Sequence, residues 1–84
     1  MATSDPKWRR PRYPMPDDIQ KALEARGLTG DYQARPAYQQ NDYIGWITKA
    51  KMQATRDKRL GQMLGELEQG GVYMKMPHHP SKKD

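Results

Sequence analysis

The apolar residues of this chain recur at helical spacing, and that spacing constrains the fold more than any other feature of the sequence. Four of them fall at positions i, i+3, i+4 and i+7, which lie on one face of a helix. These four residues are Leu60, Met63, Leu64 and Leu67. The helix is expected to begin near residues 54–55 and to end at Gly70-Gly71, because glycines at this position stop a helix.

An earlier stretch has the same spacing. Its helix is expected to begin near Pro16, since proline is favoured in a first helical turn. Asp17 and Asp18 follow and complement the positive end of the helix dipole. Gly27 is the natural stop, so this helix has about three turns.

A further helix is expected from about residues 39–41 to Lys51. It carries an aromatic stripe, for which core packing is favoured over a cofactor site. Gly45 lies in its middle, where glycine costs up to about 1 kcal/mol relative to alanine, and a close approach of another helix would explain it. Residues 28–37 are expected to form a compact connector with Leu28 and Tyr32 pointing inward.

These stripes together predict the core, with Trp46 at its centre. The predicted core residues are Ile19, Leu23, Tyr43, Trp46, Ile47, Leu60, Met63, Leu64 and Leu67. Only four β-branched aliphatic residues occur in the 84-residue chain, which argues against a sheet. The sequence therefore predicts an all-α fold, a small domain of three to four helices.

The ends differ in composition from the predicted helical domain of residues 16–70. Residues 1–15 are rich in proline and are expected to form an extended arm, pinned to the helices by Trp8, Tyr13 and Met15. The alternative is a disordered tail with incidental aromatic residues. Residues 71–84 are expected to form an extended segment that folds back on the body and then a frayed, flexible tail.

The amino-acid composition indicates the compartment of the protein and a low stability of its fold. Hydrophobic residues make up 35% of the chain, so the core is thin, and a partner or a second copy is expected to add stability. The absence of cysteine excludes disulfides and fits a reducing compartment. No apolar run approaches the roughly 20 residues of a membrane helix, and residues 1–12 do not resemble a secretory signal. We therefore expect a cytoplasmic protein without membrane insertion.

The catalytic inventory is poor. Both serines lie in the tails, and His78 and His79 stand between prolines without further metal ligands at a useful spacing. No glycine-rich phosphate loop is present, and the acids show no pairing typical of a general acid and base. We expect no enzymatic activity, no metal and no cofactor.

The informative feature is a basic junction between the last two predicted helices. Its candidate anion-binding or partner-binding residues are Lys49, Lys51, Thr55, Arg56 and Arg59. Arginines at the start of the last helix and two acids at its end, Glu66 and Glu68, oppose the helix dipole. Either Arg56 and Arg59 reach acids such as Asp42, Asp17 or Asp18 and tie helices together, or they form an anion cradle with Thr55. The structural interpretation is favoured.

The residues at this junction resemble a known family. The pattern is Tyr43, Trp46-Ile47, Ala50-Lys51, Thr55-Arg56 and Arg59-Leu60. It resembles the C-terminal helical module of the bacteriocin-protection, OmpD-associated (YdeI/OmdA-like) family, and residues 16–23 resemble that module's first helix. The resemblance implies a bacterial helical module in which Trp46 is structural and Thr55, Arg56 and Arg59 form the signature. It supplies no catalytic residue, and we expect the proline-rich arm to stand in the place of the β-rich domain of longer members.

The sequence thus predicts a non-catalytic interaction module, which the family resemblance links to envelope stress or bacteriocin tolerance. It is expected to bind an unidentified protein, or its own copy, through the basic junction and the aromatic-bearing arm. The alternative is binding of nucleic acid or of phosphate and other anions at the same junction. A helix-turn-helix outline is present, but the last helix offers mainly charge and few side chains that read bases.

Overall fold

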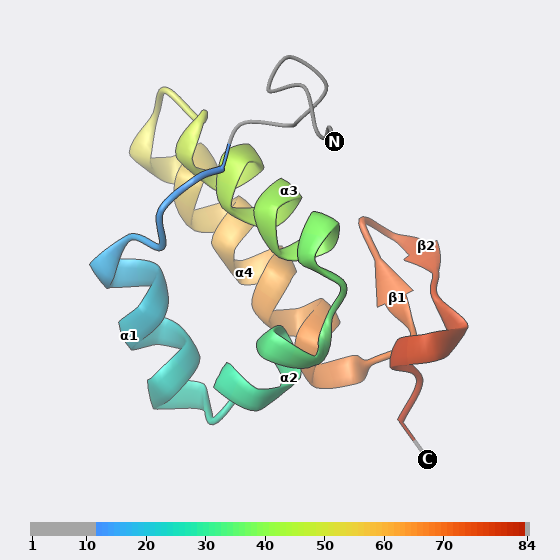
Figure 1. Cartoon of the computed structure of the whole chain (residues 1–84). Helices are drawn as coiled ribbons and strands as arrows, with labels where there is room; N and C mark the ends of the chain where they lie inside the picture. Colours follow the sequence, from blue (N-terminus) through green and yellow to red (C-terminus); the bar gives the residue numbers. More distant parts are fainter. Residues whose placement is uncertain (1–11, 84) are drawn as a thin grey trace, which may run out of the picture.

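The computed structural model describes residues 12–83, and most of them are helical (Figure 1). The helices are α1 (Asp17–Arg26), α2 (Thr29–Ala34), α3 (Ala37–Thr48) and α4 (Gln53–Gln69). A two-stranded antiparallel hairpin follows, with strands β1 (Val72–Tyr73) and β2 (Met76–Pro77), and then a 3-10 helix (His79–Ser81). The predicted helical fold of three to four helices is confirmed. No helix in the described part of the chain is long and apolar enough to cross a membrane.

The first helix has the ends that its sequence predicts. Pro16 precedes α1, and Asp17 and Asp18 stand in its first turn. Gly27 ends it with a left-handed φ of 67°, a conformation that glycine adopts without strain. The N–H of Leu28 then donates to the Leu23 carbonyl at 2.8 Å, and the chain turns directly into α2.

The connector predicted for residues 28–37 contains the short helix α2, and Leu28 and Tyr32 are buried as expected. The next helix, α3, begins earlier than predicted, at Ala37, because Pro36 supports a helix start directly after it. It also ends earlier, at Thr48, whose hydroxyl donates to the Ile44 carbonyl at 2.7 Å.

The core lies where α1, α2, α3 and α4 meet, and α4 runs along α3 through the middle of the fold (Figure 1). Its buried hydrophobic residues are Ile19, Leu23, Leu28, Tyr32, Tyr43, Ile44, Ile47, Met63, Leu64 and Leu67. Every predicted core residue is among them except Trp46 and Leu60. These two are partly buried and pack against the edge of the core, so the prediction that Trp46 lies at its centre is wrong.

The arm is pinned to the helices over its described residues. Tyr13 and Met15 pack against the core, and the Tyr13 N–H donates to Asn41 Oδ1 at 2.9 Å. Trp8, the third predicted anchor, lies outside the described residues.

The C-terminal segment folds back on the body as predicted, but it forms a small sheet that the sequence argument did not expect. Tyr73 of β1 and Met74 pack against the core. The tail expected to fray instead makes local contacts up to Lys83. The Gly71 N–H donates to Ser81 Oγ at 3.1 Å, and Lys83 Nζ lies 3.2 Å from a carboxylate oxygen of Asp31.

Candidate functional site

A cleft of about 450 Å³ lies between the arm, α3 and the hairpin. Its lining mixes aromatic rings with a few polar groups. The lining residues are Tyr13, Asn41, Asp42, Gly45, Trp46, Lys49, Tyr73 and Met74. The cleft joins the two regions from which the sequence predicted partner binding, because Tyr13 belongs to the arm and Lys49 to the basic junction.

Gly45 lets the arm approach α3. A Cβ atom added to this glycine would lie 2.6 Å from the Tyr13 ring, closer than real side chains come. The sequence suggested a second helix as the reason for a glycine in mid-helix, and the structure instead shows the arm's tyrosine there. The position of Tyr13, and with it one wall of the cleft, therefore depends on the missing side chain.

Two cations of the basic junction lie against the aromatic residues of the cleft. Lys49 Nζ lies 5.3 Å from the centre of the Tyr13 ring, and the Arg59 guanidinium carbon lies 5.4 Å from the Trp46 ring. Arg59 Nη1 also donates to the Trp46 carbonyl at 2.7 Å. Cations over aromatic faces attract them and fix both partners. Trp46 is therefore held at the cleft by Arg59.

The remaining junction residues point elsewhere. Arg56 Nη2 donates to both carboxylate oxygens of Asp18 at 3.0 and 3.1 Å and ties α4 to α1. This is the kind of contact that the structural interpretation predicts. Arg59 reaches a main-chain carbonyl rather than an acid, which the sequence did not indicate. Lys51 is exposed and Thr55 is half-buried, so the structure does not bring all five candidate residues to one point.

The hairpin wall of the cleft rests on a buried carboxylate. Glu66 of α4 is 6% exposed and accepts the N–H groups of Met74 and Lys75, both at 2.8 Å. Met74 and Lys75 form the turn between the strands with φ values of 49° and 65°, a region that residues other than glycine rarely adopt. The Tyr43 hydroxyl donates to Glu66 Oε1, and Gln62 Nε2 donates to the other oxygen. These bonds hold the strained turn beside the cleft.

Sequence reasoning missed this role of Glu66 and treated it as a misplaced charge at a helix end. A signal was present, because Glu66 follows Met63 by three residues and so lies beside the apolar stripe. Tyr73 completes the wall. Its hydroxyl donates to Asp42 Oδ2 at 2.7 Å, and its ring meets that of Tyr43 edge-on at 5.4 Å.

The buried tyrosines keep their protons. Burial and the hydrogen bond to Glu66 raise the pKa of Tyr43 well above the ordinary value of 10.0. Burial alone raises the pKa of Tyr32. At neutral pH both hydroxyls are therefore hydrogen-bond donors, and Tyr32 donates to the Gln40 carbonyl at 3.2 Å.

His78 and Ser81 of the tail are hydrogen-bonded neighbours. Ser81 Oγ lies 2.8 Å from His78 Nδ1, while its hydroxyl donates to the His78 carbonyl at 3.0 Å. Ser81 Oγ also accepts the Gly71 N–H, so these contacts fold the tail on itself. Among residues 12–83, no three His, Cys, Asp or Glu side chains are grouped to hold a metal ion.

Comparison with known proteins gives one family match. A family model described as bacteriocin-protection, YdeI or OmpD-associated matches residues 12–70. The matched region includes the described arm, α3 and α4, and hence all of the cleft except its hairpin wall. No curated protein and no solved structure matches the chain.

Proposed function

Because the chain belongs to the bacteriocin-protection, YdeI or OmpD-associated family, we propose that it is a non-catalytic interaction module in bacteriocin protection. It binds a protein partner through the cleft between the arm, α3 and the hairpin. The role in bacteriocin protection rests on the family, and the choice of the cleft rests on its geometry.

The single observation that carries the proposal is the combination of two aromatic walls and a cation in one cleft. A volume of about 450 Å³ lies in the range of sites that hold small ligands or single side chains. Tyrosine, tryptophan and arginine dominate the binding energy of protein interfaces. Tyr13 and Trp46 both line this cleft, and Arg59 packs on the Trp46 ring, so an apolar side chain of the partner can lie between the rings while an acid meets Lys49.

The absence of catalysis is part of the same proposal. Ser81 Oγ lies within hydrogen-bond distance of the His78 carbonyl and accepts the Gly71 N–H, and burial raises the pKa of the Tyr43 and Tyr32 phenols. We assign its action to the cytoplasm, for which the lack of cysteine is the supporting observation.

Nucleic-acid binding at the basic junction is the alternative function. Arg56 and Arg59 both donate to groups within the chain, which leaves fewer of their donors for phosphates. The contacts therefore favour a protein partner. The alternative would be supported by an affinity for duplex DNA that falls steeply with salt and that is weakened by substitutions at the junction residues.

The test uses a matched pair of methionines. A photo-reactive phenylalanine replaces Met74, which lines the cleft, or Met52, which is 69% exposed outside it. In bacteria exposed to a bacteriocin, the first variant should cross-link to a partner and the second should not. The purified partner should then bind the Lys49→Glu protein at least about tenfold more weakly than the Lys58→Glu protein, in which an exposed α4 lysine is reversed.

Both steps can contradict the proposal. Equal cross-linking from the two methionine positions, or equal affinity of the two charge-reversal variants, shows that the cleft is not the binding site. Loss of bacteriocin survival in the Lys49→Glu strain, with normal survival in the Lys58→Glu strain, links the cleft to protection. Normal survival in both strains separates the cleft from that role.

A further inference from the structure

A second, smaller cavity of about 160 Å³ lies on the other side of α4's end, between α2 and the C-terminal tail. Its charged lining consists of Arg35, Asp31, Lys82 and Lys83. None of these residues lines the cleft of the proposed function. The sequence treated the two lysines as part of a flexible tail, so their approach to Arg35 comes from the structure alone.

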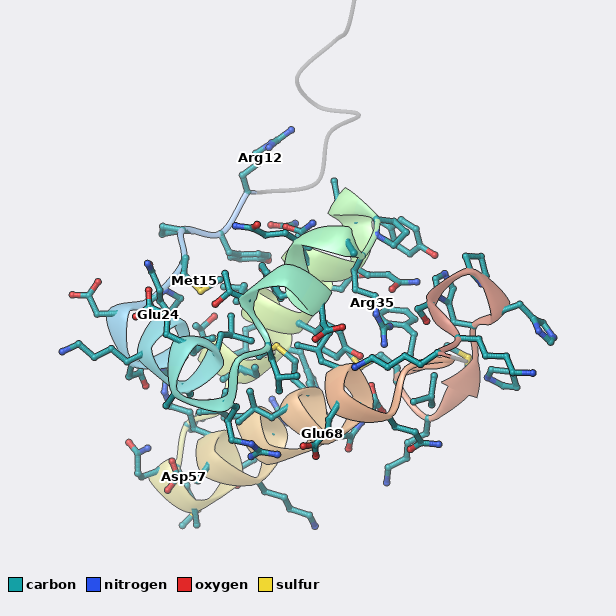
Figure 2. All side chains as sticks on the ribbon, turned by 90° about the horizontal axis from the view of Figure 1, so that it is seen from below. Arg12, Met15, Glu24, Arg35, Asp57 and Glu68 are labelled. Carbon is teal, nitrogen blue, oxygen red and sulfur yellow. The ribbon has the colours of Figure 1, made fainter. Side chains whose placement is uncertain are left out.

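Arg35 is a buried charge whose hydrogen bonds go to neutral groups. It is 4% exposed and lies beside the C-terminal segment (Figure 2). Its Nη1 donates to Gln39 Oε1 and its Nη2 donates to the Glu66 carbonyl, both at 3.2 Å. A guanidinium group has five N–H donors, and buried charges are ordinarily paired. Among the described residues, no carboxylate forms an ion pair with Arg35.

The tail is fixed against the cavity by specific contacts. Ser81 Oγ accepts the Gly71 N–H, and Lys83 pairs with Asp31 at 3.2 Å. Gly70 permits the approach, since a Cβ added there would lie 2.6 Å from Cγ of Lys83 and 2.7 Å from the Ser81 carbonyl oxygen. Lys83 is therefore held at the cavity, and Lys82 lines it with an exposed side chain.

The charges of the lining leave the cavity positive. Arg35, Lys82 and Lys83 supply three positive charges and Asp31 one negative charge. The carbonyl end of α4 adds roughly half a negative charge, which Arg35 already meets at the Glu66 carbonyl. The lining therefore stays net positive, and the buried Glu66 carboxylate, which acts with Arg35 on the Tyr43 hydroxyl, lies outside it.

We propose that this cavity binds a phosphate-class oxyanion, with Arg35 as its buried donor and Lys82 as its mobile cation. A water molecule takes about 30 Å³ of liquid volume, so 160 Å³ admits a tetrahedral oxyanion with little water besides. A nucleoside or a peptide segment does not fit inside. Bound phosphate joins α2, the end of α4 and the tail, whether it is a free ion or the terminal group of a larger molecule. The inference is independent of the partner bound at the cleft.

The test is an amide NMR titration of the full chain with inorganic phosphate, at ionic strength held constant with chloride. Saturable shifts are expected at Arg35, at residues 81–83 and at the Arg35 Nε–H. Arg35→Gln also removes the bond to the Glu66 carbonyl and so endangers the fold. The test variant is therefore Lys82→Gln, which should raise the phosphate Kd about three- to tenfold, while Lys58→Gln on the exposed face of α4 leaves it unchanged.

Three outcomes overturn the proposal. They are linear, unsaturable shifts, equal Kd values for the two lysine variants, and shifts confined to Lys51, Thr55, Arg56 and Arg59. The last would move the anion site to the basic junction. A parallel titration with phosphoserine distinguishes the sources. Equal affinity indicates a free ion, and tighter binding of phosphoserine indicates a phosphate carried by a larger molecule.

Discussion

The Tyr13 ring lies over the α-carbon of Gly45, so close that a methyl group on Gly45 would come within 2.6 Å of it. Glycine in mid-helix lowers helix stability by about 1 kcal/mol relative to alanine. At this glycine α3 packs against the arm, and the Tyr13 N–H donates to Asn41 Oδ1 one turn earlier in the helix. The glycine thus joins the arm to the helix and shapes the cleft at the same point.

We expect Tyr13→Ala to lower the free energy of unfolding by about 1–2 kcal/mol, because a half-buried ring loses its packing. In a Gly45→Ala background the same substitution should cost about 0.5 kcal/mol or less, since the alanine has already displaced the ring. Urea unfolding of the two single variants and the double variant measures this coupling. Additive effects would mean that Tyr13 and Gly45 are not coupled.

Arg56 and Arg59 should behave differently although they lie one turn apart. The pair of Arg56 with Asp18 is exposed, so Arg56→Gln should cost about 0.5 kcal/mol or less. Arg59→Gln should cost about 1–1.5 kcal/mol, because it removes the bond to the Trp46 carbonyl and the contact with the indole.

The second readout is tryptophan emission, recorded in a Trp8→Phe background so that Trp46 is the remaining indole. Arg59→Gln should shift this emission to longer wavelength, because the indole becomes more exposed to water. Arg56→Gln should leave it in place. An equal shift in both variants would contradict the assignment of Trp46 to Arg59.

Lys75→Gly should stabilise the protein. Lys75 has a φ of 65° in the hairpin turn, where a side chain costs about 1 kcal/mol and glycine costs little. The same substitution at Lys58, in the exposed face of α4, should destabilise by about 0.7–1 kcal/mol. Thermal unfolding of the two variants therefore gives shifts of opposite sign, and a lower Tm for Lys75→Gly would show that the turn is not strained.

The helices and most of the core follow from the sequence because apolar spacing, proline and glycine act locally. Ile19, Leu23 and the stripe on α4 are buried as that spacing predicts. Trp46 is the exception, since its burial depends on where the arm and Arg59 lie and not on its own helix. The earlier start of α3 at Ala37 could have been predicted from Pro36. The preference of proline for helix starts was applied only to α1.

The candidate site was less accessible to sequence reasoning. The Lys49 contact with Tyr13 joins residues 36 positions apart, and no periodicity reports such a pair. Glu66 was misread because its charge outweighed its place on the apolar face, and its partners Met74 and Lys75 lie in a turn without the usual Asn-Gly signal. The burial of Glu66 thus had a local signal, but its partners, which are joined to it at long range, had none.

The hydrogen bond between Tyr43 and Glu66 should make stability depend on alkaline pH. Because the pKa of Tyr43 in the folded protein lies well above its ordinary value of 10.0, the folded state keeps a proton that the unfolded chain releases. Its contribution is complete below pH 10 and is lost as the pH rises through the folded-state pKa. Urea unfolding between pH 8 and pH 11 should show a fall of at most about 1.4 kcal/mol per pH unit from this group.

Tyr43→Phe isolates that contribution. At neutral pH it should cost about 1–2 kcal/mol, because Glu66 loses one of its donors while buried. Above pH 10 the variant should lose less stability per pH unit than the unaltered protein, so the two curves converge. Tyr38→Phe removes the hydroxyl of a ring that is 49% exposed and is the matched control. Parallel curves for Tyr43→Phe and the unaltered protein would mean that the Tyr43 proton does not stabilise the fold.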